Sequence, residues 1–246
     1  AGQKEIVLTG VNTGDFGRTT GERFIDLLRA LNEVEGIERY RISSIEPNLL
    51  TDEIIAFCAA SPKFMHHFHI PLQSGSDKIL GLMRRRYNTT KFAERIEAVR
   101  RAMPDAFLGI DVIVGFPGET EAEAMDTVSL VEEVGFDALF TFIYSPRPGT
   151  KAAAMPDPAT RAEKQKWFDR LLEVQNNMSA KLHAAYVGKT VRVLVDGESD
   201  DPEYPLTSRT EGNRLVRLKG DKALIGQFAD VAVTGSNTWA LYGEAV

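Results

Sequence analysis

The chain has 246 residues, of which 43% are hydrophobic, and it carries a formal net charge of −6 at pH 7. This length suits one barrel-sized domain with a small appendage, and the apolar share is ordinary for a folded globular protein. The negative charge argues against a generally basic nucleic-acid binder. Cys58 is the only cysteine, which excludes an internal disulfide and a multi-cysteine metal site built from this chain alone.

The sequence shows neither a signal peptide nor a membrane-spanning segment. The stretch AGQKEIVLTG has no apolar core of signal-peptide length, and no later stretch approaches the roughly 18 uncharged apolar residues of a membrane span. We therefore expect a cytoplasmic protein with no membrane contact. Because the sequence lacks an initiator Met and enters a strand at once, we also expect it to be the downstream part of a longer chain.

Strand and helix patterns alternate up to Gly149. Strand-like runs occupy Glu5–Thr9, Arg39–Ser43, His66–Ile70, Phe107–Val114 and Ala138–Tyr144. Helical periodicity occupies Thr20–Asn32, Leu49–Ala59, Tyr87–Met103 and Glu119–Val134. Such repeats predict an α/β fold with a parallel sheet, either a barrel or a doubly wound sheet.

Polarity alternates along the predicted strands. In HHFHI, Phe68 and Ile70 share one face while His67 and His69 share the other. One face would then meet helices and the other something polar, which suits a barrel whose interior holds a ligand. We therefore predict a partial parallel βα barrel.

The composition changes after Gly149. Pro156 and Pro158 precede a long amphipathic helix, predicted from about Thr160 to Ala185, and from Val187 onward short strands alternate with glycines. We predict one domain over residues 1–185 and a small all-β barrel of oligonucleotide-binding type over residues 186–246.

Polar loops follow all five predicted strands. They read TGVNTGDFG, SIEPN, PLQSGSD, GFPGET and YSPRPGT. Ligands in parallel architectures bind at the carboxyl ends of strands, so these loops form the candidate site. Small residues there let a polar ligand approach the backbone, and a sugar–adenine group suits Gln73 and Ser74. Each loop taken alone is also consistent with ordinary turn chemistry.

Three other features are less specific. His67 and His69 share a strand face but have no acidic or thiol partner at metal-ligand spacing, so we predict no metal there. The run Arg84–Arg86 is either a solvated helix end or an RNA contact. Between Arg209 and Lys222 there are five basic and two acidic residues, a local excess that suits either phosphate contacts or solubility.

In combination the motifs resemble one family, and the resemblance covers nearly the whole chain. HIPLQSGSD, LMRRRY, DVIVGFPGET and FIYSPRPGT occur in that order, and the tail carries SRTEGNRLV, LIGQFADVAVT and LYGE. The sequence resembles the radical S-adenosylmethionine (SAM) methylthiotransferases, which place a methylthio group on tRNA adenosines or on a ribosomal protein. The tail resembles the TRAM domain, with which these enzymes bind RNA. The TGVNTG loop and ISSIEP resemble the enzymes specific for threonylcarbamoyladenosine rather than isopentenyladenosine.

The resemblance implies a mechanism with two [4Fe–4S] clusters in the full-length enzyme. One cluster, held by a CxxxCxxC loop, would cleave SAM to a radical that attacks carbon two of the adenine, and the other would supply sulfur. It also implies SAM-binding residues at the strand ends, but it assigns no catalytic side chain. The implied SAM contacts are Gly10, Asn12, Ser44, Glu46, His69, Gln73, Ser74, Asp111, Gly115, Tyr144 and Ser145. The implied RNA contacts are Arg84, Arg85, Arg86, Arg209, Arg214, Arg217 and Lys219.

Neither set of cluster cysteines occurs in this chain, so we expect it to hold no metal and to be inactive alone. The predicted partners are SAM and tRNA, and we expect a monomer. The alternatives are a methylthiotransferase acting on isopentenyladenosine or a ribosomal protein, and a non-catalytic RNA-binding protein. A phosphate-binding barrel enzyme such as an aldolase ranks last, because no predicted strand contains a lysine apart from the flanking Lys4.

Overall fold

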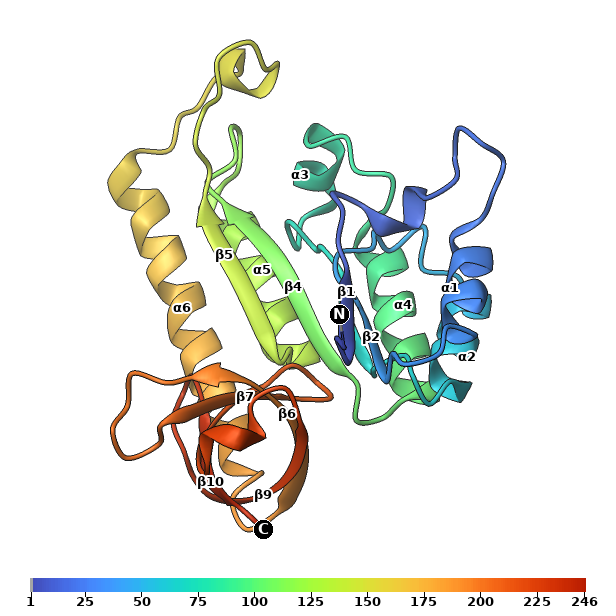
Figure 1. Ribbon diagram of the computed structural model, residues 1–246. Coiled ribbons are helices and arrows are strands. Elements are labelled where there is room, and N and C mark those ends of the chain that lie inside the picture. The colour runs from blue at the N-terminus through green and yellow to red at the C-terminus, as the bar shows by residue number, and fades with distance from the viewer. Residues whose placement is uncertain (1) are drawn as a thin grey trace.

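The computed structural model describes residues 2–246, which form two domains joined by a long helix (Figure 1). The first domain is an open parallel sheet with helices on one side. The second is a small closed β-barrel that lies against the amino ends of the sheet. The predicted partial parallel barrel followed by a small all-β barrel is confirmed. Within the described residues, no helix is both long and apolar enough to cross a membrane.

The sheet of the first domain has its strands in sequence order. β1 pairs with β2, and β3, β4 and β5 pair in turn, all in parallel. Isolated bridges from Tyr40 to Phe64 and from Ser44 to His69 connect the two groups. β1 therefore lies at one edge and β5 at the other. The strands span Glu5–Leu8 (β1), Arg39–Ile42 (β2), His67–His69 (β3), Phe107–Val114 (β4) and Ala138–Ile143 (β5).

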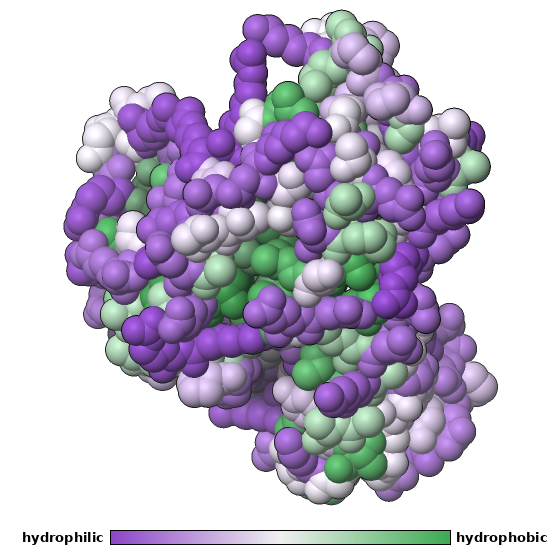
Figure 2. Space-filling model, turned by 180° about the vertical axis from the view of Figure 1, so that it is seen from behind, coloured by the Kyte–Doolittle hydropathy of each residue, from purple (hydrophilic) through white to green (hydrophobic). Residues whose placement is uncertain are grey.

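Helices cover the outer face of this sheet and bury its apolar side chains. Tyr40, Phe68 and Phe92 are among the fully buried residues of the core that the sheet and helices share. The opposite, solvent-facing side of the helices is mostly hydrophilic, with hydrophobic areas between hydrophilic ridges (Figure 2). The helices span Phe24–Asn32 (α1), Asp52–Ala60 (α2), Asp77–Leu82 (α3), Thr89–Ala102 (α4) and Glu121–Val134 (α5).

Two helices differ from the prediction. α1 begins at Phe24 instead of Thr20, because Gly17 and Gly21 adopt left-handed conformations that belong to a turn. α3 was not predicted: its six residues are too few for a periodic pattern, although the Ser76 hydroxyl caps it by accepting the Ile79 N–H. Short 3-10 turns span Thr13–Asp15 (η1), Ala152–Ala154 (η2) and Lys222–Leu224 (η3).

The connecting helix α6 (Arg161–Ala184) packs along β5 and α5 and buries Trp167 and Leu171. Its start is fixed by a capping box between Thr160 and Glu163. The second domain then closes in the order β10-β8-β7-β6-β9. Its strands span Thr190–Glu198 (β6), Leu206–Thr210 (β7), Leu215–Lys219 (β8), Phe228–Ser236 (β9) and Leu241–Ala245 (β10). The domain boundary between residues 185 and 186 stays our proposal.

Two buried arginines of β2 join the domains. Arg39 and Arg41 are 3% and 2% exposed and lie on the inner face of the sheet, opposite the core residue Tyr40. Arg39 donates to the carbonyl oxygens of Arg209 (3.3 Å) and Arg192 (3.4 Å) in the second domain.

Arg41 binds both domains at once. It donates to the carbonyl oxygen of Glu211 at 2.7 Å and pairs with the Glu5 carboxylate of β1 at 3.1 Å. The sequence pattern predicted a ligand on the polar inner face of the sheet. At the amino end the structure instead places the β7–β8 turn of the second domain there, because these guanidinium groups need acceptors away from water.

Arg214 completes this interface. It is 7% exposed, pairs with Asp137 just before β5, and stacks on the rings of Phe107 and Tyr186 at 5.2 and 4.9 Å. Our sequence analysis named Arg214 as an RNA contact. Its burial and its ion pair with Asp137 give Arg214 a role in holding the two domains together, and its assignment as an RNA contact stays a prediction.

We predict that Arg41→Ala lowers the free energy of unfolding by about 3 kcal/mol, because it leaves Glu5 with only the longer contact to Arg39 at 3.9 Å and removes the hydrogen bond to Glu211. Urea denaturation of both proteins would measure this. Arg29→Ala is the matched control: Arg29 also pairs with a glutamate at 2.9 Å, but on the surface, and its loss should have little effect. Equal effects of the two substitutions would contradict the structural role of Arg41.

Candidate functional site

A polar cavity of about 460 Å³ lies at the carboxyl ends of the parallel strands. Its lining includes residues from the loops after β1, β2 and β3 and from β4 itself. Five of the predicted cofactor-binding residues therefore meet in one place. They are Asn12, Ser44, Glu46, Gln73 and Asp111.

Asn12 ties the first two loops together. Its side-chain oxygen accepts the backbone N–H of Glu46 at 3.2 Å, and its side-chain nitrogen donates to Asp15 at 3.1 Å. The next residue, Thr13, donates both its backbone N–H (2.9 Å) and its hydroxyl (2.8 Å) to the carbonyl oxygen of Ser44. The loops after β1 and β2 thus hold a fixed shape at the cavity wall.

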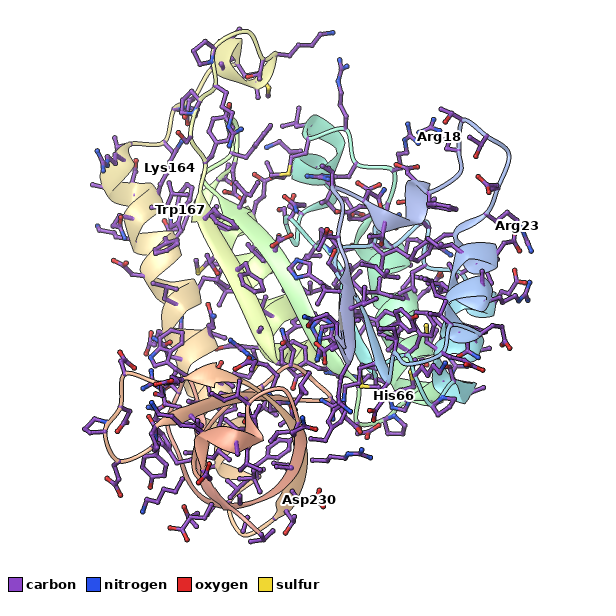
Figure 3. The ribbon with its side chains drawn as sticks, in the orientation of Figure 1. Arg18, Arg23, His66, Lys164, Trp167 and Asp230 are labelled. Atoms are coloured by element: carbon purple, nitrogen blue, oxygen red, sulfur yellow. The ribbon has the colours of Figure 1, made fainter. Side chains whose placement is uncertain are left out.

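Two ion pairs lie at the polar cavity. Glu46 binds Arg85 at 3.2 Å, and Asp111 binds the Nε2 of His69 at 2.8 Å. Arg18 lies at the same end of the sheet, whereas His66 lies at the opposite, amino end (Figure 3). Both carboxylates still line open space, so they can accept hydrogen bonds from ligand hydroxyls or an ammonium group.

Gln73 has an unusual backbone. Its φ is +70°, a left-handed conformation that favours glycine, and its side chain is 7% exposed. Hydrogen bonds with β4 hold it there: its N–H donates to the carbonyl of Asp111 at 2.7 Å, and its carbonyl accepts the N–H of Ile113 at 2.9 Å. Strain held in this way at a cavity wall is a feature of functional sites.

The remaining predicted cofactor residues lie outside the polar cavity. Gly10 is exposed beyond the end of β1, and Ser145 is exposed beyond β5. Ser74 is fully buried and accepts the N–H of Ser76 at 3.2 Å. Gly115 and Tyr144 belong to a second group of side chains around the GFPGET loop, and Tyr144 lines a separate cavity. The assignments of all these residues stay predictions.

The small residues of QSGSD have a structural explanation that the sequence did not reveal. The Gly75 N–H donates to the Thr127 hydroxyl of α5 at 2.8 Å, and a Cβ on Gly75 would lie 2.6 Å from the Thr127 Cα. Gly75 is therefore small because helix α5 packs directly against its backbone. Of the five residues of QSGSD, Gln73 is the one that lines the polar cavity.

Glu119 organises the GFPGET loop. It is 3% exposed, and its carboxylate accepts the backbone N–H of Gly115, which has a φ of +72°. Lys164 of α6 packs on Gly115 and pairs with Asp157; in Figure 3 it lies at the end of α6 nearest the strand ends. Burial raises the pKa of Glu119 to about 7. Sequence reasoning assigned Glu119 only to the start of a helix.

The predicted RNA contacts differ in availability. Arg84 and Arg86 line the polar cavity and have no ion pair within residues 2–246. In the second domain, Arg217 pairs with Asp200 at 2.8 Å, and Lys219 pairs with Glu203 and Glu244, both at 3.3 Å. Arg209 pairs with Asp196 at 3.5 Å. The basic excess of the tail sequence is thus largely balanced by nearby acids.

An iron–sulfur cluster does not fit the described residues. Thiolates hold such clusters, and Cys58 is 0% exposed within α2, where burial raises its pKa to about 12. Nowhere in residues 2–246 do three His, Cys, Asp or Glu side chains gather as metal ligands. SAM does fit the polar cavity, whose carboxylates, amides and arginines match its ammonium, ribose and carboxylate groups.

Comparison with known families agrees with this architecture. The radical SAM superfamily model matches residues 1–131, and the TRAM domain model matches residues 184–246. Because the first match covers more than half of the chain, the chain belongs to the radical SAM superfamily, and it carries a TRAM domain at its carboxyl end.

Curated relatives narrow the similarity further. The tRNA-2-methylthio-N(6)-dimethylallyladenosine synthase of Thermoanaerobacter sp. (strain X514) is 44% identical over 247 residues, covering 100% of this chain and 52% of the relative. The protein of the same name from Clostridium botulinum (strain Langeland / NCTC 10281 / Type F) is 42% identical, covering 100% and 55%. The chain thus spans about half the length of the curated relatives it matches.

Solved structures share the fold at low identity. Coproporphyrinogen III oxidase (HemN) from Escherichia coli, a radical SAM enzyme, matches with a TM-score of 0.55 at 12% identity, covering 99% of this chain and 59% of that one. The radical SAM methyltransferase TsrM from Kitasatospora setae matches with a TM-score of 0.50 at 13% identity, covering 61% and 28%. These matches show the fold alone.

We predict that Gln73→Gly is more stable than Gln73→Ala by about 1 kcal/mol, because only glycine adopts a φ of +70° without strain. Both variants lose the same amide group, so the difference isolates the backbone. Thermal and urea unfolding would measure it. An alanine variant as stable as the glycine variant would show that Gln73 is not strained.

We predict a pH-dependent stability from Glu119. Its pKa lies above the ordinary 4.5, at about 7, so its stabilising contribution is complete below pH 4.5 and is lost as the pH rises through 7. The wild type should lose up to about 3 kcal/mol over this window relative to Glu119→Gln. Unfolding measured at a series of pH values tests this, with the exposed Glu121→Gln as control. A pH slope that Glu119→Gln leaves unchanged would contradict the prediction.

Proposed function

We propose that this chain is the SAM-binding and RNA-binding part of a tRNA methylthiotransferase that acts on dimethylallyladenosine by radical chemistry. One observation carries the proposal: a polar cavity formed by successive strand-end loops is lined by two arginines, Arg84 and Arg86, that have no ion pair within residues 2–246. A nucleoside-containing cofactor and an anionic polymer are the ligands that such a surface suits.

The residues of the cavity have distinct proposed roles. Glu46 and Asp111 would accept hydrogen bonds from the ammonium and ribose groups of SAM, and Asn12 would keep the two loops in position to do so. SAM, once bound, would supply the radical for the reaction. Arg84 and Arg86 would bind phosphates of the tRNA, because arginine presents its donors in a fixed fork that matches phosphate oxygens.

The proposed substrate differs from the expectation drawn from the sequence. The TGVNTG loop resembled the threonylcarbamoyladenosine enzymes, whereas the similar curated proteins are named for dimethylallyladenosine, also called isopentenyladenosine. Within this loop, the side chain of Val11 is fully exposed to solvent. An exposed side chain is weakly constrained by the fold, so its identity is a poor indicator of the substrate.

A second candidate function is supported by the absence of cluster ligands from residues 2–246. It is a non-catalytic RNA-binding protein that keeps the fold of an enzyme. The ordered polar loops argue for the first candidate, because an RNA-binding surface alone needs neither the Asn12 bridge nor the strained Gln73. Either function places the protein with tRNA in the cytoplasm, and we propose that it acts there as a monomer.

The test uses the complete gene product that contains this chain. Expressed in a host whose tRNA lacks the methylthio group, it should produce 2-methylthio-N6-dimethylallyladenosine, detected by mass spectrometry of tRNA nucleosides. The variant Asp111→Asn should lower the product at least tenfold, because it removes an acceptor from the cavity. The exposed Asp105→Asn is the control. A methylthio group found only on threonylcarbamoyladenosine would refute the proposed substrate, and none at all would favour the second candidate.

A further inference from the structure

A second cavity, of about 720 Å³, adjoins the polar cavity on the β5 side. It lies between the end of α3, the ends of β4 and β5, and the η2 turn, which stands above the strand ends in Figure 1. Its size falls within the range of about 300–1,000 Å³ that is common for ligand sites. Met83, Arg84 and Arg85 line both cavities, so the two spaces are neighbours across one short segment.

The two cavities differ in chemistry. The polar cavity is lined mostly by carboxylates, amides, hydroxyls and arginines. Most of the second cavity is lined by apolar side chains, and no acidic residue contributes to it. The apolar members are Leu82, Met83, Ile113, Phe116, Ala152 and Met155. Leu82 is 39% exposed, so its side chain presents apolar surface at this cavity.

The backbone of the dividing segment is also unusual. Arg84 has a φ of +59° at the position after the last turn of α3, where helices generally place glycine or asparagine. Its N–H donates to the carbonyl of Gly81 at 3.0 Å, which holds this conformation. Arg84 thus lines both cavities with a guanidinium that has no ion pair among the described residues, and a strained conformation at a cavity wall points to a function there.

We propose that the apolar cavity binds the dimethylallyl group of the substrate nucleoside. This inference rests on the proposed function. It adds that the apolar cavity is the part of the chain that recognises the substituent on the substrate nucleoside. With the cofactor in the polar cavity, the target adenine would lie near the dividing segment, with Arg84 on its phosphate side. The five-carbon apolar substituent would then enter the space between Met83 and Met155. Methionine side chains suit such a group because they are flexible and polarizable.

The main competing occupant is a substituent with a carboxylate, such as the threonylcarbamoyl group. Lys151 and Arg84 at the rim could pair with it. The apolar lining favours the dimethylallyl group. A carboxylate that entered this cavity would lose its hydrating water, and it could form ion pairs only with the cations at the rim. The two occupants give opposite results in a binding experiment, so they can be separated.

The experiment measures binding of the chain to RNA stem-loops that differ only in one adenosine, which is unmodified, dimethylallylated or threonylcarbamoylated. We expect the dimethylallyl RNA to bind at least tenfold more tightly than the unmodified RNA, because the apolar group leaves water. Met155→Asp should abolish this preference, measured as the ratio of the dissociation constants of the dimethylallyl and unmodified RNAs. Ala153→Asp, an exposed substitution in the same turn, should keep the preference. Ala152→Trp, which fills the cavity with an apolar ring, should also abolish it.

Each outcome decides the matter. Equal binding of the unmodified and dimethylallyl RNAs, or a preference that survives both Met155→Asp and Ala152→Trp, would overturn the inference while leaving the proposed function intact. Tighter binding of the threonylcarbamoyl RNA would overturn it in favour of the charged occupant. Failure to bind any of the three RNAs would overturn the inference and the proposed RNA-binding role together.

Discussion

The structure depends on two arginines that strand β2 buries on the inner face of the sheet. Arg39 and Arg41 keep their charge under all ordinary conditions, so each guanidinium must find acceptors once water is excluded. Glu5 satisfies part of this need, and backbone carbonyls of the second domain satisfy much of the rest. Docking of the two domains therefore buries both guanidinium groups and replaces their water with backbone carbonyl acceptors of the second domain.

This docking assigns opposite tasks to the two ends of the sheet. The β7–β8 turn closes the amino end, where Gly212 lies so near Phe107 that an added Cβ would be 3.2 Å from the Phe107 Cβ. The carboxyl end stays open and collects the loops after each strand, as parallel sheets generally do. The TRAM domain is thus fixed at the end of the sheet that lies opposite the polar cavity.

Periodicity in the sequence predicted the layered fold because alternation and helical spacing are local signals. The strand run Phe107–Val114 matches β4 residue for residue. Asn12, Gln73 and Asp111 were predicted to meet because strand ends share one edge of a sheet. The sequence could not show that Gly75 serves helix packing, that Arg214 is enclosed between domains, or that Glu119 is buried. These three features depend on contacts between elements that are far apart in the sequence. Periodicity is a local property, so it does not predict which distant element packs against a given residue.

The element that the sequence did not predict has the largest consequence for recognition. α3 has only six residues, yet its carboxyl end carries Met83, Arg84 and Arg85 into the wall between the polar and apolar cavities. The strand-end loops form a cavity suited to SAM, a cofactor shared across the superfamily. The sequence motifs of these loops therefore identify the family, but they say little about which substrate is bound. Discrimination between an apolar and a charged substituent would then fall to the exposed end of α3 and to η2, which lie beyond the strand ends.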